Sequence, residues 1–273
     1  MELFNILVIG ETDWEEHKDF RLYIEKSFSK VNLKVCDKDL FFIDSTHSWI
    51  KVDGVIWRGQ FEIDEELQRH LLEIISLSEV KCINPVESIL HHGSNISMYN
   101  ALCKFGINVL KKGAYLIGSS SLDFIDPIFP IVIKTGNYHM GYGKALAKDA
   151  ETWRDFLDIS VLLEKPVSLE PFVPYTMDVR CQYISGEVKA ILRQPSHWKA
   201  NVDPVKVSKF NPPEELIDDT KNFAQYIGAD ILGLDWILNQ DNKWLVLEGN
   251  LSPGLNDLKP DRQKINDLLR NKL

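Results

Sequence analysis

Apolar and polar positions in residues 1–92 form short patches that predict strands and helices in alternation. Asp64 stands as an N-cap before leucines and isoleucines at helical spacing, which predicts a core-facing helix from Asp64 to about Ser78. A second helix is expected to begin near Asp13. The apolar runs between these helices predict strands at Phe4–Ile9, Asn32–Cys36, Gly54–Trp57 and Val80–Ile83. Alternation of this kind is typical of a mostly parallel sheet covered by helices.

The rest of the chain mixes longer helices with hairpins. Helices are predicted from Ser94 to Gly106, from about Asp149, from about Pro213 to Ile227 and from about Pro260. Single strands are predicted at Ala114–Ile117 and Ile131–Lys134, and after Pro166 the pattern changes to hairpins. The hairpin strands are expected at Ser168–Val173, Met177–Ile184, Glu187–Arg193, Ile231–Leu238 and Trp244–Asn250.

These patterns divide the 273 residues into three expected domains. The first is an N-terminal α/β domain over residues 1–92, the second a central subdomain over residues 93–166, and the third a C-terminal subdomain over residues 167–273. The predicted fold class is therefore α/β, with lobes of the α+β type after the first domain.

The composition excludes several classes of protein. Hydrophobic residues make up 44% and charged residues 26% of the chain, which is ordinary for a globular protein. A net charge of −9 argues against a general nucleic-acid binder, because such a protein needs a basic face. The four cysteines form no Cys-x-x-Cys pair, so we expect neither a zinc site nor a disulfide framework, and we expect a cytoplasmic location. No apolar run has the length of a membrane span or a signal peptide, so we expect a soluble protein.

A lysine at the end of a buried strand is the first sign of a phosphate site. Lys134 ends an apolar run, where an ammonium group is costly unless it meets an anion. Gly136, Gly141 and Gly143 follow in the loop before Lys144, and glycines let backbone N–H groups approach phosphate oxygens. Because alanine follows Lys144 and the glycine spacing differs, the loop is not a Walker P-loop. A hairpin without a ligand is the alternative for this loop taken alone.

An acid and a proline-stiffened extended segment come next in the chain. Glu170 is followed by Pro171, Phe172 and Val173, which could present backbone groups to an adenine edge and an apolar ring to its face. A domain hinge without a ligand is equally consistent with these residues.

Two arginines lie on the predicted hairpin that follows. Asp178 and Arg180 share one face of a strand, and Arg193 ends the strand paired with it. Facing arginines beside a phosphate loop would bind phosphate or carboxylate oxygens with two hydrogen bonds each. Alternatively, Asp178 and Arg180 form an exposed ion pair of little energetic weight.

The last predicted hairpin carries hard oxygen ligands. Asp235 lies on its first strand, and Glu248 and Asn250 lie on the same face of the second. Carboxylate and amide oxygens without sulfur or imidazole suit Mg²⁺, or Mn²⁺ in its place, held against phosphates. The alternative is a turn that ends in acidic and Asn residues, as turns often do.

Two further residues are candidates for substrate binding. Arg58 ends a strand of the N-terminal domain, where ligands bind at the carboxyl ends of parallel strands, and could bind an acid; a surface ion pair is the alternative. Lys199 lies in the loop after Arg193 and could contact the acceptor, or it could be a solvated loop residue.

In this order the pieces resemble the ATP-grasp superfamily, most closely its synapsin and RimK-like branch. The loop matches the branch's Lys-x-Gly-x-x-His-x-Gly-x-Gly-Lys pattern at Lys134, Gly136, His139, Gly141, Gly143 and Lys144. The stretch from Asp178 through Arg193 to Trp198-Lys199-Ala200-Asn201 resembles the branch's Asp-Ile-Arg to Trp-Lys-x-Asn run. The Asp235 and Glu248-Gly249-Asn250 set is similar to the branch's magnesium ligands.

The resemblance implies an ATP-grasp fold behind an N-terminal, Rossmann-like pre-ATP-grasp domain. It implies ATP bound by the loop residues Lys134 to Lys144 and by Glu170, Phe172, Val173 and Asp178, with a magnesium ion on the ligand set. The implied activity joins a carboxylate to an amine through an acylphosphate, with Arg193 and Arg180 in catalytic roles and Arg58, Lys199 and Asn201 toward the substrates. The substrates would be small molecules or peptides, and a homodimer is expected by analogy.

One departure from the branch keeps other functions open. Many members carry an Asp-Lys pair at the start of the central helix, and this chain has Ser94-Asn95 there. Lys144 could substitute for the absent lysine. A synapsin-like protein that binds ATP without ligation is one alternative, and an ATP-grasp kinase that phosphorylates a hydroxyl is another. The Glu248-Gly249-Asn250 pattern favours catalysis, because synapsins deviate at that pair.

Overall fold

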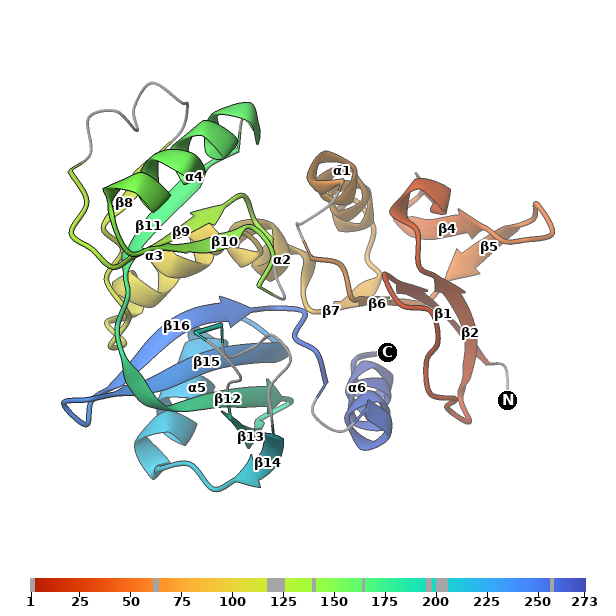
Figure 1. The fold of residues 1–273 in the computed structure, drawn as a ribbon. Helices are drawn as coiled ribbons and strands as arrows, with labels where there is room; N and C mark the ends of the chain where they lie inside the picture. The colour runs from red at the N-terminus through yellow and green to blue at the C-terminus, as the bar shows by residue number, and fades with distance from the viewer. Residues whose placement is uncertain are drawn as a thin grey trace.

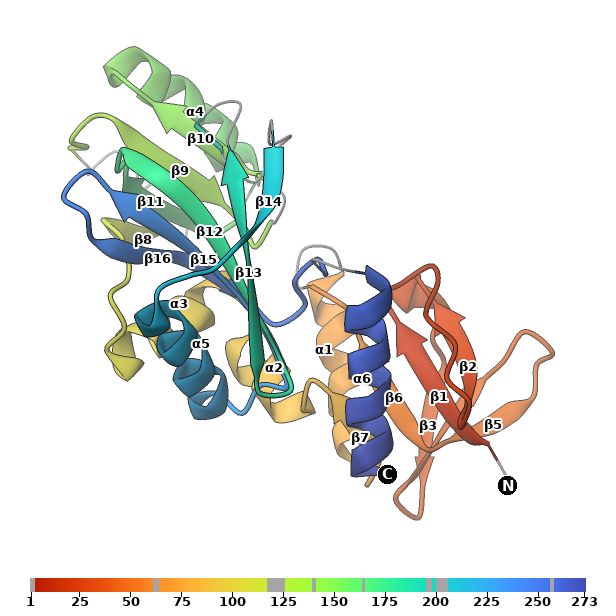
Figure 2. The same ribbon diagram turned by 90° about the horizontal axis from the view of Figure 1, so that it is seen from below.

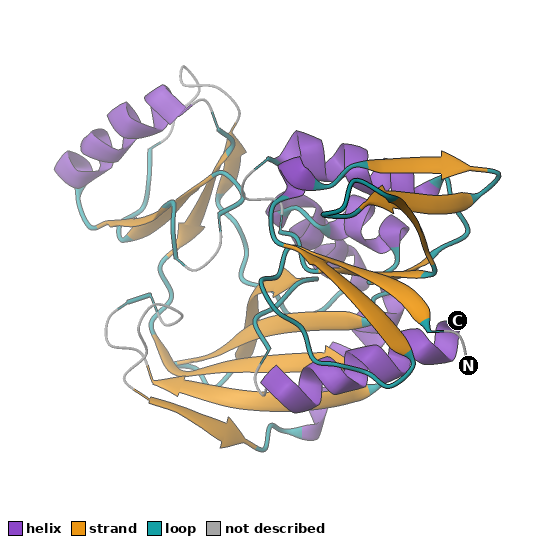
Figure 3. Ribbon diagram, turned by 90° about the vertical axis from the view of Figure 1, so that its right-hand side faces the viewer, coloured by secondary structure: helices purple, strands orange, loops and turns teal. Residues whose placement is uncertain are grey.

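The computed structural model describes residues 3–60, 64–116, 126–138, 141–163, 165–194, 198–199, 206–255 and 258–273. Within these ranges the chain forms a parallel N-terminal sheet, a small sheet beside it, and two antiparallel sheets on the side away from both chain ends (Figures 1 and 3). The predicted α/β class is confirmed. No helix in the described ranges combines the length and apolarity that a membrane span requires.

The N-terminal sheet has the strand order β2-β1-β6-β7, and all of its strand pairs are parallel. Its strands are β1 (Phe4–Ile9), β2 (Phe20–Glu25), β6 (Gly54–Trp57) and β7 (Lys81–Ile83). In β1, Leu7 and Ile9 share a core with helix α1 (Glu65–Ser76), whereas Ile6 and Val8 share a core with the last helix, α6 (Leu258–Lys272). Both faces of the sheet are covered, which explains its nearly continuous apolar strands. Figure 2 shows α6 lying along this first sheet although it ends the chain.

A three-stranded antiparallel sheet extends the N-terminal part. It contains β3 (Leu33–Cys36), β4 (Asp39–Ile43) and β5 (Trp49–Val52), after a short 3₁₀ helix, η1 (Phe28–Lys30). Sequence patterns predicted only the first of these strands. Leu40 and Phe42 alternate with more exposed neighbours and enter the same core as α1.

The predicted helix near Asp13 is wrong. No helix forms between β1 and β2, and Phe20–Glu25 is instead an edge strand parallel to β1. The segment before β2 is held by α6: Trp14 Nε1 donates to Asn266 Oδ1 at 2.8 Å, and Asn266 Nδ2 donates to the carbonyl of Glu15 at 2.9 Å. These contacts with a distant part of the chain override the local helical preference.

The central sheet has the order β10-β9-β11-β8 with antiparallel pairs. Its strands are β8 (Ala114–Leu116), β9 (Ile131–Thr135), β10 (Lys144–Ala147) and β11 (Val167–Pro171). Helix α4 (Ala150–Leu163) covers one face, where its Trp153 packs with Ile131 and Ile133 of β9. Because side chains alternate along a strand, Val132 and Lys134 point to the opposite face.

The C-terminal sheet has the order β14-β13-β12-β15-β16, also antiparallel. Its strands are β12 (Tyr175–Ile184), β13 (Glu187–Gln194), β14 (Lys206–Phe210), β15 (Ile231–Asn239) and β16 (Trp244–Asn250). Helices α3 (Asn95–Phe105) and α5 (Glu214–Tyr226) share a core with this sheet, and α2 (Val86–His92) leads into α3. The predicted start of α3 is confirmed, because the Ser94 hydroxyl accepts the backbone N–H of Ser97 at 3.1 Å.

The predicted hairpin pairing of Ser168–Val173 is wrong. Strand β11 pairs with β8 and β9 of the central sheet, not with β12. Pro171 and Pro174 have no N–H to continue a ladder, and the N–H of Phe172 donates to the carbonyl of Pro130 at 3.1 Å. The segment after β11 therefore carries the chain from one antiparallel sheet to the other.

Asn84 connects the N-terminal part to the C-terminal sheet. Its side chain is buried, and its Nδ2 donates to the carbonyls of Ile231 at 2.8 Å and Leu251 at 2.6 Å. Its Oδ1 accepts the N–H groups of Asp230 and Ile231, both at 2.6 Å. One side chain thus joins the end of β7 to the start of β15 and the end of β16.

We expect Asn84→Ala to lower the free energy of unfolding by about 2–4 kcal/mol, because it leaves buried backbone groups without partners. Urea unfolding followed by circular dichroism would measure this change. Asn108→Ala is the matched control, since Asn108 is exposed and donates one hydrogen bond, to Trp244; we expect a loss below about 1 kcal/mol. Equal losses in the two variants would contradict the role given to Asn84.

Candidate functional site

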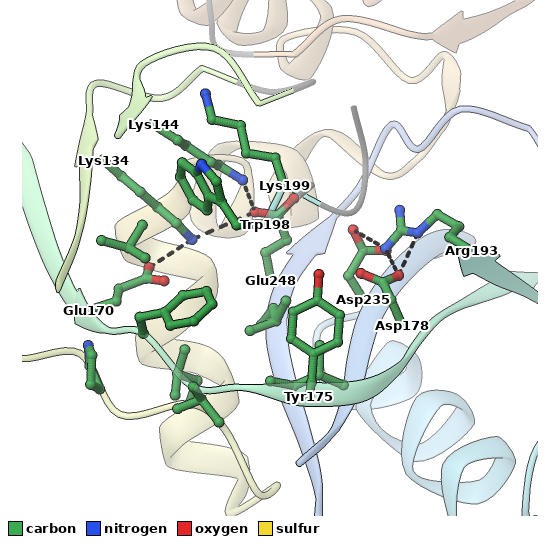
Figure 4. A pocket seen from close by; sticks show the side chains of 17 residues that line it. Lys134, Lys144, Glu170, Tyr175, Asp178, Arg193, Trp198, Lys199, Asp235 and Glu248 are labelled. Carbon is green, nitrogen blue, oxygen red and sulfur yellow. Dashed lines mark hydrogen bonds and ion pairs between the residues drawn. The ribbon is translucent and has the colours of Figure 1, made fainter. Parts of the chain in front are cut away.

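A cavity of about 90 Å³ lies between the two antiparallel sheets (Figure 4). The segment that joins the sheets, Pro171 to Tyr175, forms part of its wall. Its apolar lining includes Leu110, Val132, Phe172, Ile237 and Leu247. Its charged lining comes from both sheets and from the loop after β13: Lys134, Lys144, Glu170, Asp178, Arg193, Lys199, Asp235 and Glu248.

Lysines of the central sheet meet glutamates on one side of the cavity. Lys134 and Lys144 are directly opposite each other on β9 and β10. Lys134 Nζ lies 2.7 Å from Glu170 Oε1 and 3.8 Å from Glu248 Oε2, and Lys144 Nζ lies 2.8 Å from Glu248 Oε2. Two like charges facing each other destabilise a sheet unless anions compensate them, and Glu170 and Glu248 do so here.

Burial and charge act in opposite directions on these groups. Burial opposes the charged form of Lys134, but Glu170 and Glu248 outweigh it and raise the pKa of the lysine. Burial likewise disfavours the carboxylate of Glu170, but Lys134 and Lys112 lower its pKa overall. The pair is therefore ionised, and it is expensive to separate unless other charges replace the partners.

Arginines and aspartates of the C-terminal sheet meet on the other side, where Figure 4 shows Arg193 beside Asp178 and Asp235. Asp178 is the cross-strand neighbour of Arg193, and Arg180 is the cross-strand neighbour of Asp235. Arg180 binds both oxygens of Asp235, at 2.7 and 2.8 Å. Arg193 lies 2.5 Å from Asp178 and 3.3 Å from Asp235. The exposed pair between Asp178 and Arg180, the alternative drawn from sequence, is not what forms.

The two aspartates are affected differently by this arrangement. Burial raises the pKa of Asp178 to about 6, and Arg193 only partly opposes it. Burial also disfavours the carboxylate of Asp235, but Arg180 and Arg193 together outweigh it and lower its pKa. Asp235 is therefore the more firmly ionised of the two.

The predicted metal ligands divide between two cavities. Asp235 and Glu248 are cross-strand neighbours on β15 and β16, and both line the cavity between the sheets. Asn250 lines a smaller cavity beside Trp57 of β6, and its Oδ1 accepts the N–H of Ser252 at 2.7 Å. Across the described part of the chain, no three His, Cys, Asp or Glu side chains form a ready metal cluster. The two adjacent carboxylates of Asp235 and Glu248 fit a hard divalent ion that also takes oxygens from its ligand.

The predicted phosphate loop has the backbone that its glycines allow. Gly136, Gly141 and Gly143 all have positive φ, at 69°, 80° and 64°. A side chain at residue 143 would also lie 2.6 Å from the carbonyl oxygen of Thr135, so only glycine fits. The carbonyl of Gly141 accepts a hydrogen bond from Lys199 Nζ at 2.9 Å. The three glycines do not line the cavity, and His139 lies outside the described residues.

The predicted substrate residues have different surroundings. Lys199 lines the cavity, and Asn201 lies outside the described residues. Arg58 is buried beside the segment that follows Asn250, and its Nη2 donates to the carbonyl of Pro253 at 2.6 Å. Burial lowers the pKa of Arg58 to about 10. Arg58 is thus not the surface ion pair that sequence allowed, and it does not line the main cavity.

Sequence patterns missed Lys112 and Tyr175. Lys112 binds Glu170, and Tyr175 lines the cavity, where burial raises the pKa of its hydroxyl to about 12. Lys112 stands beside Lys111, and such a pair is typical of a solvated surface. The apolar stretch just before the pair, Ile107 to Leu110, was the one available signal.

Comparison with known proteins agrees with this geometry. The profile of the RimK-like ATP-grasp domain matches residues 95–268. A probable alpha-L-glutamate ligase of Mannheimia succiniciproducens is 31% identical over 135 residues, which cover 46% of this chain and 44% of the relative. The chain thus matches less than half the length of that curated relative.

Solved structures share the whole fold at low identity. D-alanyl-alanine synthetase A of Vibrio cholerae superposes with a TM-score of 0.73 at 13% identity, covering 99% of this chain and 98% of that one. Macrocyclase MdnC of Microcystis aeruginosa, bound with precursor peptide MdnA, superposes with a TM-score of 0.72 at 11% identity, covering 99% and 100%.

The profile match covers more than half of the 273 residues and includes β9, the segment Pro171 to Tyr175, β15 and β16. The resemblance drawn from the loop and the Glu-x-Asn pair is thereby confirmed. The chain belongs to the RimK-like ATP-grasp family.

Proposed function

We propose that the chain is an ATP- and magnesium-dependent ligase that joins a carboxylate to an amine through an acylphosphate. The observation that carries this proposal is the meeting of Lys134 and Lys144 from one sheet with Asp235 and Glu248 from the other around one cavity. The family supports it, and so does the curated relative, which is named a probable ligase.

The nucleotide base would lie against the apolar side of the cavity. Val132 and Leu247 offer apolar contact, Phe172 offers a flat ring, and Glu170 offers a carboxylate at the end of β11. The phosphates would then extend toward Lys134 and Lys144, whose ammonium groups replace the water that phosphate oxygens lose on binding.

Asp235, Glu248 and Asn250 would hold the magnesium ion. When bound, the ion supplies positive charge that neutralises phosphate oxygens and polarises them. Before binding, Lys144 neutralises Glu248, and Arg180 neutralises Asp235. On binding, phosphates would pair with the lysines, so that Lys144 keeps an anionic partner and Glu248 can hold the ion.

The chemistry proceeds in two balanced steps. A substrate carboxylate oxygen attacks the γ-phosphorus of ATP, and ADP leaves; the amine then attacks the acyl carbon, loses a proton, and inorganic phosphate leaves. Arg193 would donate to the oxygens that gain negative charge in both steps, while Asp178 holds its guanidinium in place. Arg180 would keep Asp235 ionised and oriented.

Closure of the glycine loop would protect the acylphosphate from water. Lys199 already contacts this loop through the carbonyl of Gly141. Another contact comes from Asn137, whose Oδ1 accepts the N–H of Asn95 at 3.0 Å at the start of α3. The loop therefore contacts Lys199, which follows β13, on one side and the start of α3 on the other.

The substrates we propose are an amino acid or peptide acid and an amine. The names of the relatives, a glutamate ligase, a D-alanyl-alanine synthetase and a macrocyclase bound with a peptide, support this class. Arg58, Lys199 and Asn201 remain our proposed substrate contacts. For Arg58 the support is that Nε and Nη1 have no hydrogen-bond partner among the described residues.

We expect Glu248→Gln to reduce ADP release, measured with the acid and amine present, by at least about 100-fold, because glutamine lacks the negative charge that holds the ion and neutralises a lysine. Coupled spectrophotometric detection of ADP would measure it. Glu214→Gln is the matched control, since Glu214 is exposed on α5. Unchanged turnover in Glu248→Gln would overturn the metal assignment.

A synapsin-like protein that binds ATP without ligation is the second candidate, favoured by Ser94-Asn95 at the start of α3. Thermal unfolding with ATP and Mg²⁺, alone and with candidate acids and amines, separates the two. A ligase is stabilised by ATP and releases both ADP and phosphate once acid and amine are present. Stabilisation without phosphate release under any acid and amine would favour the binder, and ADP release without free phosphate would indicate a kinase.

A further inference from the structure

Lys112 brings a second buried ammonium group to the carboxylate that Lys134 binds. It lies in the segment between α3 and β8, and its Nζ binds Glu170 Oε1, the oxygen that lies 2.7 Å from Lys134. The side chains of Lys112 and Glu170 are only 7% and 4% exposed. Two ammonium groups thus share one carboxylate oxygen in a place with little water.

The neighbouring charges do not balance this pair. The other carboxylate nearby, Glu248, lies 2.8 Å from Lys144 and 3.8 Å from Lys134. Among the described residues, three lysines therefore share two glutamates, and an excess of positive charge is buried. Because an uncompensated buried charge is costly, the arrangement favours an additional anion. The excess grows when Glu248 turns toward a divalent ion, as proposed above.

The position of Lys112 is fixed by α3. Its backbone N–H donates to the hydroxyl of Tyr99 at 3.0 Å, and its Nζ lies 5.4 Å from the centre of the Tyr99 ring. A cation held over an aromatic face loses little further freedom when it meets a ligand. Lys112 is therefore already placed for binding.

Lys112 also lines a cavity that adjoins the proposed nucleotide site. This cavity of about 20 Å³ lies next to the main one, and the two cavities share Lys134, Glu170 and Glu248 in their walls. Asn95, at the start of α3, lines the same small cavity and carries no charge. The cations that line this small cavity are therefore Lys112 and Lys134, and Asn95 at the start of α3 adds none.

We propose that Lys112 is a nucleotide-positioning residue: it holds Glu170 and supplies the second cation that the phosphates of a nucleoside di- or triphosphate neutralise. This inference rests on the proposed function and assigns the role to a residue outside the glycine loop and outside the start of α3. The charge of the site determines the ligand class. The excess of buried positive charge favours a multiply charged anion, such as the phosphates, over the neutral base or sugar.

The ionisation of Lys112 is sensitive to pH. Burial, followed by the charge of Lys134, lowers its pKa to about 8, and Glu170 only partly opposes this. The titratable groups around it are Tyr99 and Cys103 on α3, Lys134 on β9, Glu170 on β11 and Glu248 on β16. As pH rises through about 8, the unliganded protein loses this proton, so affinity for an anion falls.

The test compares Lys112→Met, Lys112→Arg and the control Lys111→Met, because Lys111 is the exposed neighbour. Isothermal titration with ADP and with adenosine, at pH 7 and pH 9, measures the dissociation constants. We expect Lys112→Met to weaken ADP binding by about 10-fold or more, since a charge-assisted contact of about 1.4 kcal/mol or more is lost. Adenosine binding should change less than about 3-fold, and Lys111→Met should match the unaltered chain.

The arginine variant separates charge from structure. The unaltered chain should bind ADP more weakly at pH 9 than at pH 7, and Lys112→Arg should lose most of that difference, because arginine stays protonated. Unchanged ADP affinity in Lys112→Met, or an equal loss for ADP and adenosine, would overturn the inference alone. Failure of the unaltered chain to bind ADP at all would overturn the proposed function and this inference with it.

Discussion

The burial of opposite charges together, in a cavity between two sheets, is the constraint on which the rest of the site depends. Cations and carboxylates of both sheets are buried together, and each has an opposite charge within ion-pair distance: Lys112, Lys134, Lys144, Arg180 and Arg193 with Glu170, Glu248, Asp178 and Asp235. Buried ion pairs contribute little to stability, because desolvation offsets their attraction. In the function proposed here, they would allow a charged ligand to enter by exchange, with phosphates replacing carboxylates on the lysines. The fold places Glu248 of one sheet against Lys134 and Lys144 of the other, where this exchange would occur.

Much of the fold could be predicted because its signals are local. The cap at Ser94 defines the start of α3, and the alternation of strand and helix patterns predicted a mostly parallel sheet covered by helices. The predictions fail where contacts between residues far apart in the sequence determine the structure. The segment after β1 is held by Asn266, near the other end of the chain, and no local pattern contains that contact. The predicted pairing of β11 was wrong for the same reason, since strand pairing is determined by the whole sheet and not by neighbours in sequence.

The site was predictable where a residue contradicts its surroundings. Lys134 stands out in an apolar strand, and Asp235 and Glu248 stand out in the final hairpin, so each is costly without a charged partner. Lys112 gave no such signal, because a lysine pair after a helix is ordinary on a surface. The separation of Asn250 from the other two oxygen ligands also could not be foreseen, since it depends on the turn in which its side chain accepts the N–H of Ser252.

The central claim is that one triphosphate lies between the lysines of the central sheet and the carboxylates of the C-terminal sheet. A crystal structure with Mg²⁺ and a non-hydrolysable ATP analogue tests it most directly. The account predicts phosphate oxygens within hydrogen-bond distance of Lys134 and Lys144, with Asp235 and Glu248 turned to the metal ion. A nucleotide bound elsewhere, with the contacts of Lys134 to Glu170 and of Lys144 to Glu248 unchanged, would contradict it.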